Sequence, residues 1–315
     1  MELLLLVQHL VTANCQLILY FTFNFIIQYN QIGNDGASTI GTALGNCKLL
    51  TNLIFYIDAN QIGDNGAQNI GLGLSKCTQL RNLELALVQN QIGNDGASTI
   101  GTALGNCKLL TNLIFYIDAN QIGDNGAQNI GLGLSKCTQL TNLDFRIQQN
   151  QIGNDGASTI GTALGNCKLL TNLKFYIGSN QIGDSGAQNI GLGLSKCIQL
   201  TNLEFSIDNN QIGDDGASTI DTVLGNCKFL TNLKFNFHGN EIGDKGVQNI
   251  ALSLSNCTQL KNLAFSSDND EKFLKSREII NYFKIFGLPQ QPFWLSLSRN
   301  RVVFAYYNVK IAQNK

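Results

Sequence analysis

An uninterrupted repeat of thirty residues is the feature that most constrains the fold of this chain. An asparagine followed by Gln or Glu and then by Ile-Gly recurs at positions 30, 60, 90, 120, 150, 180, 210 and 240. Residues 31–80 are identical to residues 91–140, so the array has grown by duplication of pairs of units. A period of this length predicts a solenoid, in which each unit is stabilised by its neighbours.

Each unit reads as a strand followed by a short helix, as residues 50–79 illustrate. Inward and outward positions alternate with a period of two, which predicts a strand with one buried face; the inward set is Leu53, Phe55 and Ile57 and the outward set is Ile54, Tyr56 and Asp58. After a glycine-rich turn, one apolar stripe at helical spacing comprises Ala67, Ile70, Leu74 and Cys77. We expect Asp64 to cap that helix. Gly71 and Gly73 each weaken it by up to ~1 kcal/mol relative to alanine, so neighbouring units must hold it in place.

Repetition of this unit predicts an α/β solenoid with nine parallel strands. Strands stack ~4.8 Å apart and helices ~8–10 Å apart, so the helical side must be longer and the array must curve into a horseshoe. The sheet then lines the concave face and the helices line the convex face. The periodic asparagine stands where each strand ends, and we expect its amide to satisfy backbone groups of its own and adjacent turns.

The pattern Leu50-x-x-Leu53-x-Phe55-x-Ile57-x-x-Asn60-x-Ile62-Gly-x-x-Gly66-Ala67-x-x-Ile70-x-x-x-Leu74 resembles the ribonuclease-inhibitor-like leucine-rich repeats over roughly residues 17–269. Its strand segment is one dipeptide longer than the common frame of that family. The resemblance implies a horseshoe used mainly for protein binding and, in one branch, for activating small GTPases. It divides the chain into an irregular N-terminal half-unit with the first strand (1–29), eight repeats (30–269) and a C-terminal cap helix and tail (270–315).

Composition argues against catalysis and against several classes of partner. With two histidines in the chain, most histidine-based metal sites and hydrolytic triads lack parts, and a formal net charge of −1 gives no global attraction to nucleic acid or to an anionic membrane. The segment Gly71–Lys76 lacks the spacing of a phosphate loop, and Asp64-Asn65-Gly66 lacks the glutamate of a calcium loop. We therefore expect no enzymatic activity, no cofactor, no metal and no contact with nucleic acid or membrane.

Eight of the nine cysteines recur every thirty residues, from Cys47 to Cys257. One repeated position indicates one repeated role, so we expect a column of buried thiols maintained in a reducing compartment. The acidic N-terminus and the short apolar run at residues 17–27 do not fit a signal peptide or a membrane span. These features predict a monomeric cytoplasmic protein.

The outward strand positions vary between units, whereas the inward positions and the helix surface stay nearly constant. We expect these varied side chains to form a protein-binding surface on the concave face, with three tyrosines two units apart as anchors. The candidate residues are Tyr56, Glu84, Tyr116, Asp144, Arg146, Lys174, Tyr176, Glu204 and Lys234.

Several alternatives to a concave binding surface stay open. The concave variation is also what drift at unpacked positions produces. A lysine near the end of nearly every helix, including Lys168 and Lys196, either complements the helix dipole or forms a convex stripe for an anionic partner. The column Leu72, Leu132, Leu192 and Leu252 is expected to pack against the next helix. The alternative functions are regulation of a small GTPase and a recently duplicated array with no retained function.

Overall fold

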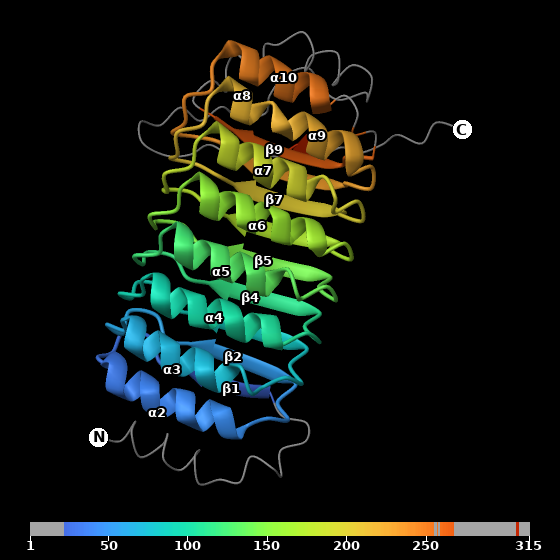
Figure 1. Cartoon of the computed structure of the whole chain (residues 1–315). Helices are drawn as coiled ribbons and strands as arrows, with labels where there is room; N and C mark the ends of the chain where they lie inside the picture. Colours follow the sequence, from blue (N-terminus) through green and yellow to red (C-terminus); the bar gives the residue numbers. More distant parts are fainter. Residues whose placement is uncertain (1–21, 255–256, 258, 268–306, 309–315) are drawn as a thin grey trace.

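The computed structural model describes residues 22–254, 257, 259–267 and 307–308. In this part of the chain one open sheet carries its strands in the order β1 to β10, and the helices stack along one face of it (Figure 1). The first nine strands are parallel, which confirms the α/β solenoid. The strands are β1 (Thr22–Ile26), β2 (Asn52–Tyr56), β3 (Asn82–Ala86), β4 (Asn112–Tyr116), β5 (Asn142–Arg146), β6 (Asn172–Tyr176), β7 (Asn202–Ser206), β8 (Asn232–Asn236), β9 (Asn262–Ser266) and β10 (Tyr307–Asn308).

One helix follows most strands and returns the chain to the start of the next. The helices are α2 (Gly33–Asn46), α3 (Asp64–Leu74), α4 (Asn94–Asn106), α5 (Asp124–Leu134), α6 (Asn154–Asn166), α7 (Asp184–Leu194), α8 (Asp214–Ala217), α9 (Thr219–Asn226) and α10 (Asp244–Leu254). None of these described helices combines the length and apolarity needed to cross a membrane.

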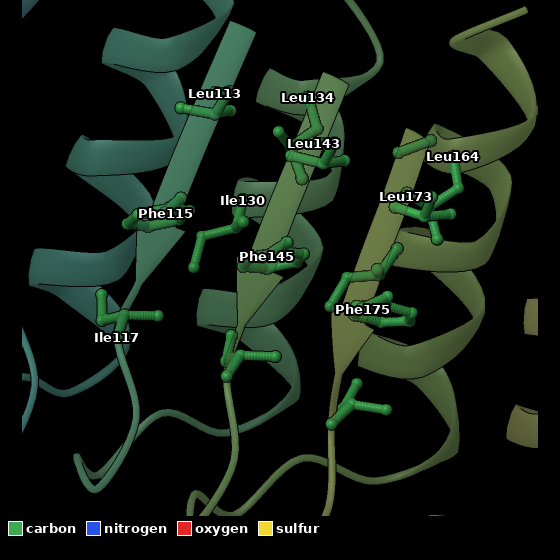
Figure 2. Close-up of a cluster of buried hydrophobic side chains, with 14 of the residues drawn as sticks. Leu113, Phe115, Ile117, Ile130, Leu134, Leu143, Phe145, Leu164, Leu173 and Phe175 are labelled. Atoms are coloured by element: carbon green, nitrogen blue, oxygen red, sulfur yellow. The ribbon is translucent and has the colours of Figure 1, made fainter. Parts of the chain in front are cut away.

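Strand register follows the sequence period without slippage. Each residue pairs with the residue thirty positions later, so Leu113 lies beside Leu143 and Phe115 beside Phe145. The inward leucines, isoleucines and phenylalanines of the strands meet the apolar stripes of the helices, as Figure 2 shows for three successive units. The rings of Phe115 and Phe145 are stacked with centroids 5.4 Å apart. One continuous apolar core therefore runs the length of the array.

The periodic asparagines form the expected ladder between strand ends. Asn150 Nδ2 donates to the carbonyls of Ile117 (3.1 Å), Ile147 (3.4 Å) and Gln148 (3.0 Å), and its Oδ1 accepts the amide hydrogen of Ile122 (3.0 Å). One side chain thus satisfies backbone groups of two units, which confirms its structural role. The same arrangement recurs at Asn90, Asn120, Asn180, Asn210 and Asn240.

The expectation that Asp64 caps its own helix is wrong. Asp64 is the first residue of α3, and its Oδ1 accepts the amide hydrogens of Gly93 (2.8 Å) and Gly96 (2.7 Å), at the start of α4. The first amides of a helix have no intrahelical acceptor, and a carboxylate there also complements the helix dipole. The equivalent residues from Asn34 to Asp214 do the same, so the starts of α3 to α8 and of α10 are capped by the preceding unit.

The cysteine column departs from expectation at its first member. Seven cysteines from Cys77 to Cys257 are free and buried, and burial raises the pKa of the Cys77 thiol to about 12, which makes it a poor nucleophile. Cys47, in contrast, is disulfide-bonded, and because the other described cysteines are free its partner lies outside the described residues. The expectation of a uniform column of thiols is therefore wrong at Cys47, and cytoplasmic localisation stays a prediction.

Two expectations for the convex side are also corrected. The side chains of Leu72, Leu132, Leu192 and Leu252 are 50–61% exposed, so this column does not pack against the next helix. The lysines stand beyond the helices rather than in the last turn, because α3 ends at Leu74 and Lys76 follows the cap residue Ser75. The leucine column and the lysine column are therefore both accessible to a partner on the convex side.

The ends of the array are described only in part. Tyr307 and Asn308, in the expected C-terminal tail, pair antiparallel with Leu263 and Asn262 at the edge of β9. The expected cap helix around residues 273–283 and most of the N-terminal half-unit lie outside the described residues. The division of the chain at residues 30 and 269 stays a prediction.

Candidate functional site

All nine candidate residues lie on the sheet face opposite the helices, in two rows that cross the strands. The charged row holds the residue after the conserved leucine of each strand, and the tyrosine row holds the residue two positions later. Parallel register places the members of a row side by side. The charged row is Ile54, Glu84, Ile114, Asp144, Lys174, Glu204 and Lys234; the tyrosine row is Tyr56, Ala86, Tyr116, Arg146, Tyr176, Ser206 and Asn236.

Each tyrosine of the row is bonded to an acid on the following strand. The hydroxyl of Tyr56 donates to Glu84, that of Tyr116 donates to Asp144 Oδ2 (2.9 Å), and that of Tyr176 donates to Glu204. Burial, followed by the interaction with Asp144, raises the pKa of Tyr116 to about 12. The tyrosines therefore offer a partner mainly their ring faces, because their protons are already donated within the chain.

Arg146 lies between two of these rings. Its Cζ atom is 4.2 Å from the ring centroid of Tyr116 and 4.9 Å from that of Tyr176. Its Nε and Nη2 donate to Asp144 Oδ1 (3.1 Å) and Oδ2 (3.2 Å), so one carboxylate neutralises the guanidinium and also accepts from Tyr116. This stack of ring, guanidinium and ring holds the three side chains in a fixed arrangement at the centre of the concave face.

The basic residues of the charged row differ in availability. Lys234 forms an ion pair with Glu204. Burial would raise the pKa of Glu204, but the bonds from Lys234 and Tyr176 outweigh it and lower that pKa. Lys174 stands between Asp144 and Glu204, is exposed, and has no ion-pair partner within the described part of the chain. Lys174 is thus the cation of this row that a partner can approach directly.

Two hollows open beside these residues. The larger, about 630 Å³, lies over the first halves of strands β6 to β9; Lys174, Glu204, Lys234 and Ala264 are among its lining residues. The smaller, about 220 Å³, lies where Ser206 interrupts the tyrosine row, with Tyr176, Glu204, Asp208 and Lys234 around it. Both combine apolar surface with a few charged groups, as binding surfaces do.

The third outward column, which includes Asp58 and Asp118, was expected to point into the hollow of the horseshoe. These carboxylates also bond the backbone of the next unit: Asp58 Oδ1 accepts the amide hydrogen of Val88 (2.7 Å), and Asp118 Oδ1 accepts that of Gln148 (2.6 Å). Burial raises the pKa of Asp118 to about 6, although the bond from Gln148 opposes the rise. These residues are connectors between turns as well as sources of negative charge.

The raised pKa of Asp118 predicts a pH-dependent stability. Between its unfolded value of 3.8 and about 6, the folded chain retains a proton that the unfolded chain has released, so stability falls as pH rises through this window. The total loss should be about 1–3 kcal/mol and complete above pH 6. Asp118→Asn, which keeps the acceptor for Gln148, should remove this component. Denaturant unfolding of both proteins between pH 3.5 and 7 measures it, and parallel stability curves would contradict the prediction.

A second asparagine ladder was not predicted from the sequence. Asn172 Nδ2 donates to Asn142 Oδ1 (2.6 Å), and Asn202, Asn232 and Asn262 each donate to the preceding member in the same way. The triplet Thr-Asn-Leu at the start of six strands is the signal that could have revealed it. This ladder borders the larger hollow and presents amide groups along its edge.

The described residues hold no group of three or more His, Cys, Asp or Glu side chains suited to a metal ion. The chemistry that the two rows provide is recognition: ring faces, one unpaired ammonium group, paired charges and amides. These are the groups that protein interfaces use as anchors and rims.

Comparison with known proteins gives one family match. The model of a family described as leucine rich repeat matches residues 79–101, 170–191, 199–220 and 229–251. A search of the curated proteins found no match.

Among solved structures, an internalin C2 from Listeria monocytogenes is 20% identical, with 77% of this chain and 78% of that chain aligned and a TM-score of 0.43. The leucine-rich-repeat ectodomain of the Arabidopsis receptor kinase HAESA, in complex with a peptide hormone ligand, is also 20% identical; 73% of this chain and 35% of that chain align, with a TM-score of 0.40. Each of the four segments that match the leucine rich repeat model spans one strand and the start of the helix that follows it.

Proposed function

We propose that this protein is a non-catalytic scaffold that binds a protein partner on the concave face. The observation that carries the proposal is the Tyr116–Arg146–Tyr176 stack, held by Asp144 and Glu204. Tyrosine and arginine are enriched among interface residues that dominate affinity, and a pre-ordered stack loses little side-chain freedom on binding. The exposed Lys174 beside the stack adds an unpaired charge for orientation.

The geometry suits an extended or convex partner element lying across strands β4 to β8. The two hollows overlap the second half of this region, from β6 onward, and the rows place basic, acidic and aromatic groups on neighbouring strands about 4.8 Å apart. The alternative of a small-GTPase regulator rests on the family resemblance, and no contact among the described residues favours it over a general scaffold. The convex columns around Leu72 and Lys76 remain the competing surface.

Replacing Tyr116 and Tyr176 together with alanine should weaken partner binding by about 2 kcal/mol or more, since both ring faces of the stack are lost. Affinity purification with quantitative mass spectrometry compares proteins retained by the wild-type chain and by this double variant. The matched pair Tyr116→Phe and Tyr176→Phe keeps the rings, removes only the hydroxyls, and should retain most binding.

The control for the convex side is the double variant Lys168→Glu and Lys196→Glu. We expect it to capture the same partner as the wild-type chain. Loss of capture in this variant, with normal capture by the alanine pair, would move the site to the lysine column and overturn the concave assignment.

A further inference from the structure

The stack of Tyr116, Arg146 and Tyr176 has a counterpart on earlier strands in which the arginine is absent. In the tyrosine row, Tyr56, Ala86 and Tyr116 are neighbours on β2, β3 and β4, just as Tyr116, Arg146 and Tyr176 are on β4, β5 and β6. Two strand spacings separate the outer residues in both cases, about 9.6 Å. The distances of 4.2 and 4.9 Å from Arg146 to its two rings fit that separation.

The acid that neutralises Arg146 also has its counterpart. Glu84 stands two residues before Ala86, as Asp144 stands two residues before Arg146. Tyr56 donates to Glu84 across 28 residues, and Tyr116 donates to Asp144 across the same separation. Three of the four groups of the arginine site are therefore repeated around Ala86, and the missing group is the guanidinium.

Glu84 is also less compensated than Asp144. Its neighbours in the charged row are Ile54 and Ile114, whereas Asp144 lies beside Lys174. Within the described part of the chain Glu84 makes no ion pair. Residues 52–60, 82–90 and 112–120 together contain the three carboxylates of Asp58, Glu84 and Asp118 and no lysine or arginine. This end of the concave face is negatively charged and has aromatic groups on both sides of Ala86.

We propose that the place above Ala86 binds the guanidinium of an arginine side chain from the protein partner, stacked on Tyr116 and Tyr56 and bonded to Glu84. This inference rests on the proposed function for the existence of a partner on the concave face. Arginine is favoured over lysine because a planar guanidinium both stacks on rings and bonds a carboxylate through two donors, as Arg146 does. Ala86 is 2% exposed because neighbouring side chains already cover its methyl group, so these side chains must move aside to admit the guanidinium.

The smaller hollow beside Ser206 is a less suitable place for the same group. Tyr176 and Glu204 are present there, but Lys234 already pairs with Glu204 and the next member of the row is Asn236. A second cation there would contact Glu204, whose charge Lys234 already neutralises, and only the ring of Tyr176. The Ala86 site differs because its acid, Glu84, has no ion-pair partner among the described residues.

The test uses a capped pentapeptide, acetyl-Gly-Ser-Arg-Ser-Gly-amide, and the same peptide with citrulline, which is neutral and nearly identical in shape. Titration followed by NMR should show saturable shifts of the Tyr56 and Tyr116 ring resonances with the arginine peptide. The citrulline peptide should bind at least about tenfold more weakly. Absence of saturable shifts, or equal affinity for the two peptides, would overturn the inference.

Two variants of the full chain use the Tyr116–Arg146–Tyr176 stack as a reference for the Ala86 site. Ala86→Arg should supply the missing guanidinium in cis, leave the chain at least as stable as wild type in thermal unfolding, and abolish the peptide-induced shifts at Tyr56. Arg146→Ala should open a second equivalent site beside Asp144 and add shifts at Tyr176. Unchanged peptide binding by Ala86→Arg would contradict the proposal.

Glu84→Gln keeps Tyr56, Ala86 and Tyr116 and should lower the affinity for the arginine peptide about tenfold. Unchanged affinity would also contradict the proposal. Partner capture by the tyrosine variants is measured separately. If the partner binds the concave face but the arginine and citrulline peptides bind equally well, this inference alone is overturned. If the tyrosine-to-alanine pair captures the partner normally and the lysine-to-glutamate pair does not, the proposed function on the concave face is overturned.

Discussion

Replacing Asn150 with alanine should lower the free energy of unfolding by about 3 kcal/mol or more. Asn150 is 9% exposed and makes four hydrogen bonds to backbone groups of Ile117, Ile122, Ile147 and Gln148. Alanine leaves several of these buried groups unpaired, at about 1–3 kcal/mol each. Since Asn150 lies in the middle of the array, its loss also weakens the coupling between the two halves of the solenoid. Chemical denaturation followed by circular dichroism measures the change.

Lys174→Ala is the matched control for this prediction. Asp144 would be a poor control, although its position on the open face suggests one, because it accepts from Tyr116 and from Arg146. Lys174 is exposed and unpaired within the described residues, so its truncation should change stability by no more than about 0.5 kcal/mol. Equal denaturation midpoints for the two variants would show that the asparagine ladder contributes little.

Gly133→Ala should destabilise the chain by about 1–3 kcal/mol, although alanine favours a helix by ~1 kcal/mol over glycine. A Cβ atom at residue 133 would lie 1.9 Å from the carbonyl oxygen of Gly101 on the preceding helix, so α4 and α5 would have to separate. The glycines in these helices therefore serve the close approach of neighbouring helices.

Gly225→Ala provides the comparison within the same fold. A Cβ atom at residue 225 meets no atom within 4 Å, so only the helix preference acts and stability should stay equal or rise by up to ~1 kcal/mol. Thermal and denaturant unfolding of the two variants should therefore move in opposite directions. If Gly133→Ala were as stable as Gly225→Ala, the helices would not be packed as closely as the structure shows.

The repeat period predicted most of the fold because every thirty-residue unit must adopt the same strand and helix and pack against its neighbours in the same way. Alternation around Phe55 located the strand, the stripe from Ala67 to Leu74 located the helix, and the position of Asn60 at the strand end predicted the ladder. What failed were rules that treat residues close in sequence as the nearest partners. In a solenoid the residue 29 positions later is as near as the residue three positions later, so Asp64 caps the following helix and not its own.

The site was predicted as a set of residues but not as a network. The structure shows that Tyr56, Tyr116 and Tyr176 each bond an acid 28 residues later, a constant separation that is visible in the sequence once parallel register is assumed. The disulfide at Cys47 could not be read from a thirty-residue period, because its partner does not belong to the column. The exposure of Leu72 depends on helix rotation, which the apolar stripe alone does not determine.

The concave assignment is tested most directly by site-specific photo-crosslinking in cells. A photoreactive amino acid at position 174, exposed on the sheet face, is compared with the same amino acid at position 192, whose leucine is 50% exposed on α7. Neither substitution removes a hydrogen bond or ion pair of the tyrosine row. We expect one discrete covalent adduct from position 174, lost when Tyr116 and Tyr176 are replaced by alanine, and none from position 192. An adduct from position 192 with none from position 174 would contradict the concave assignment.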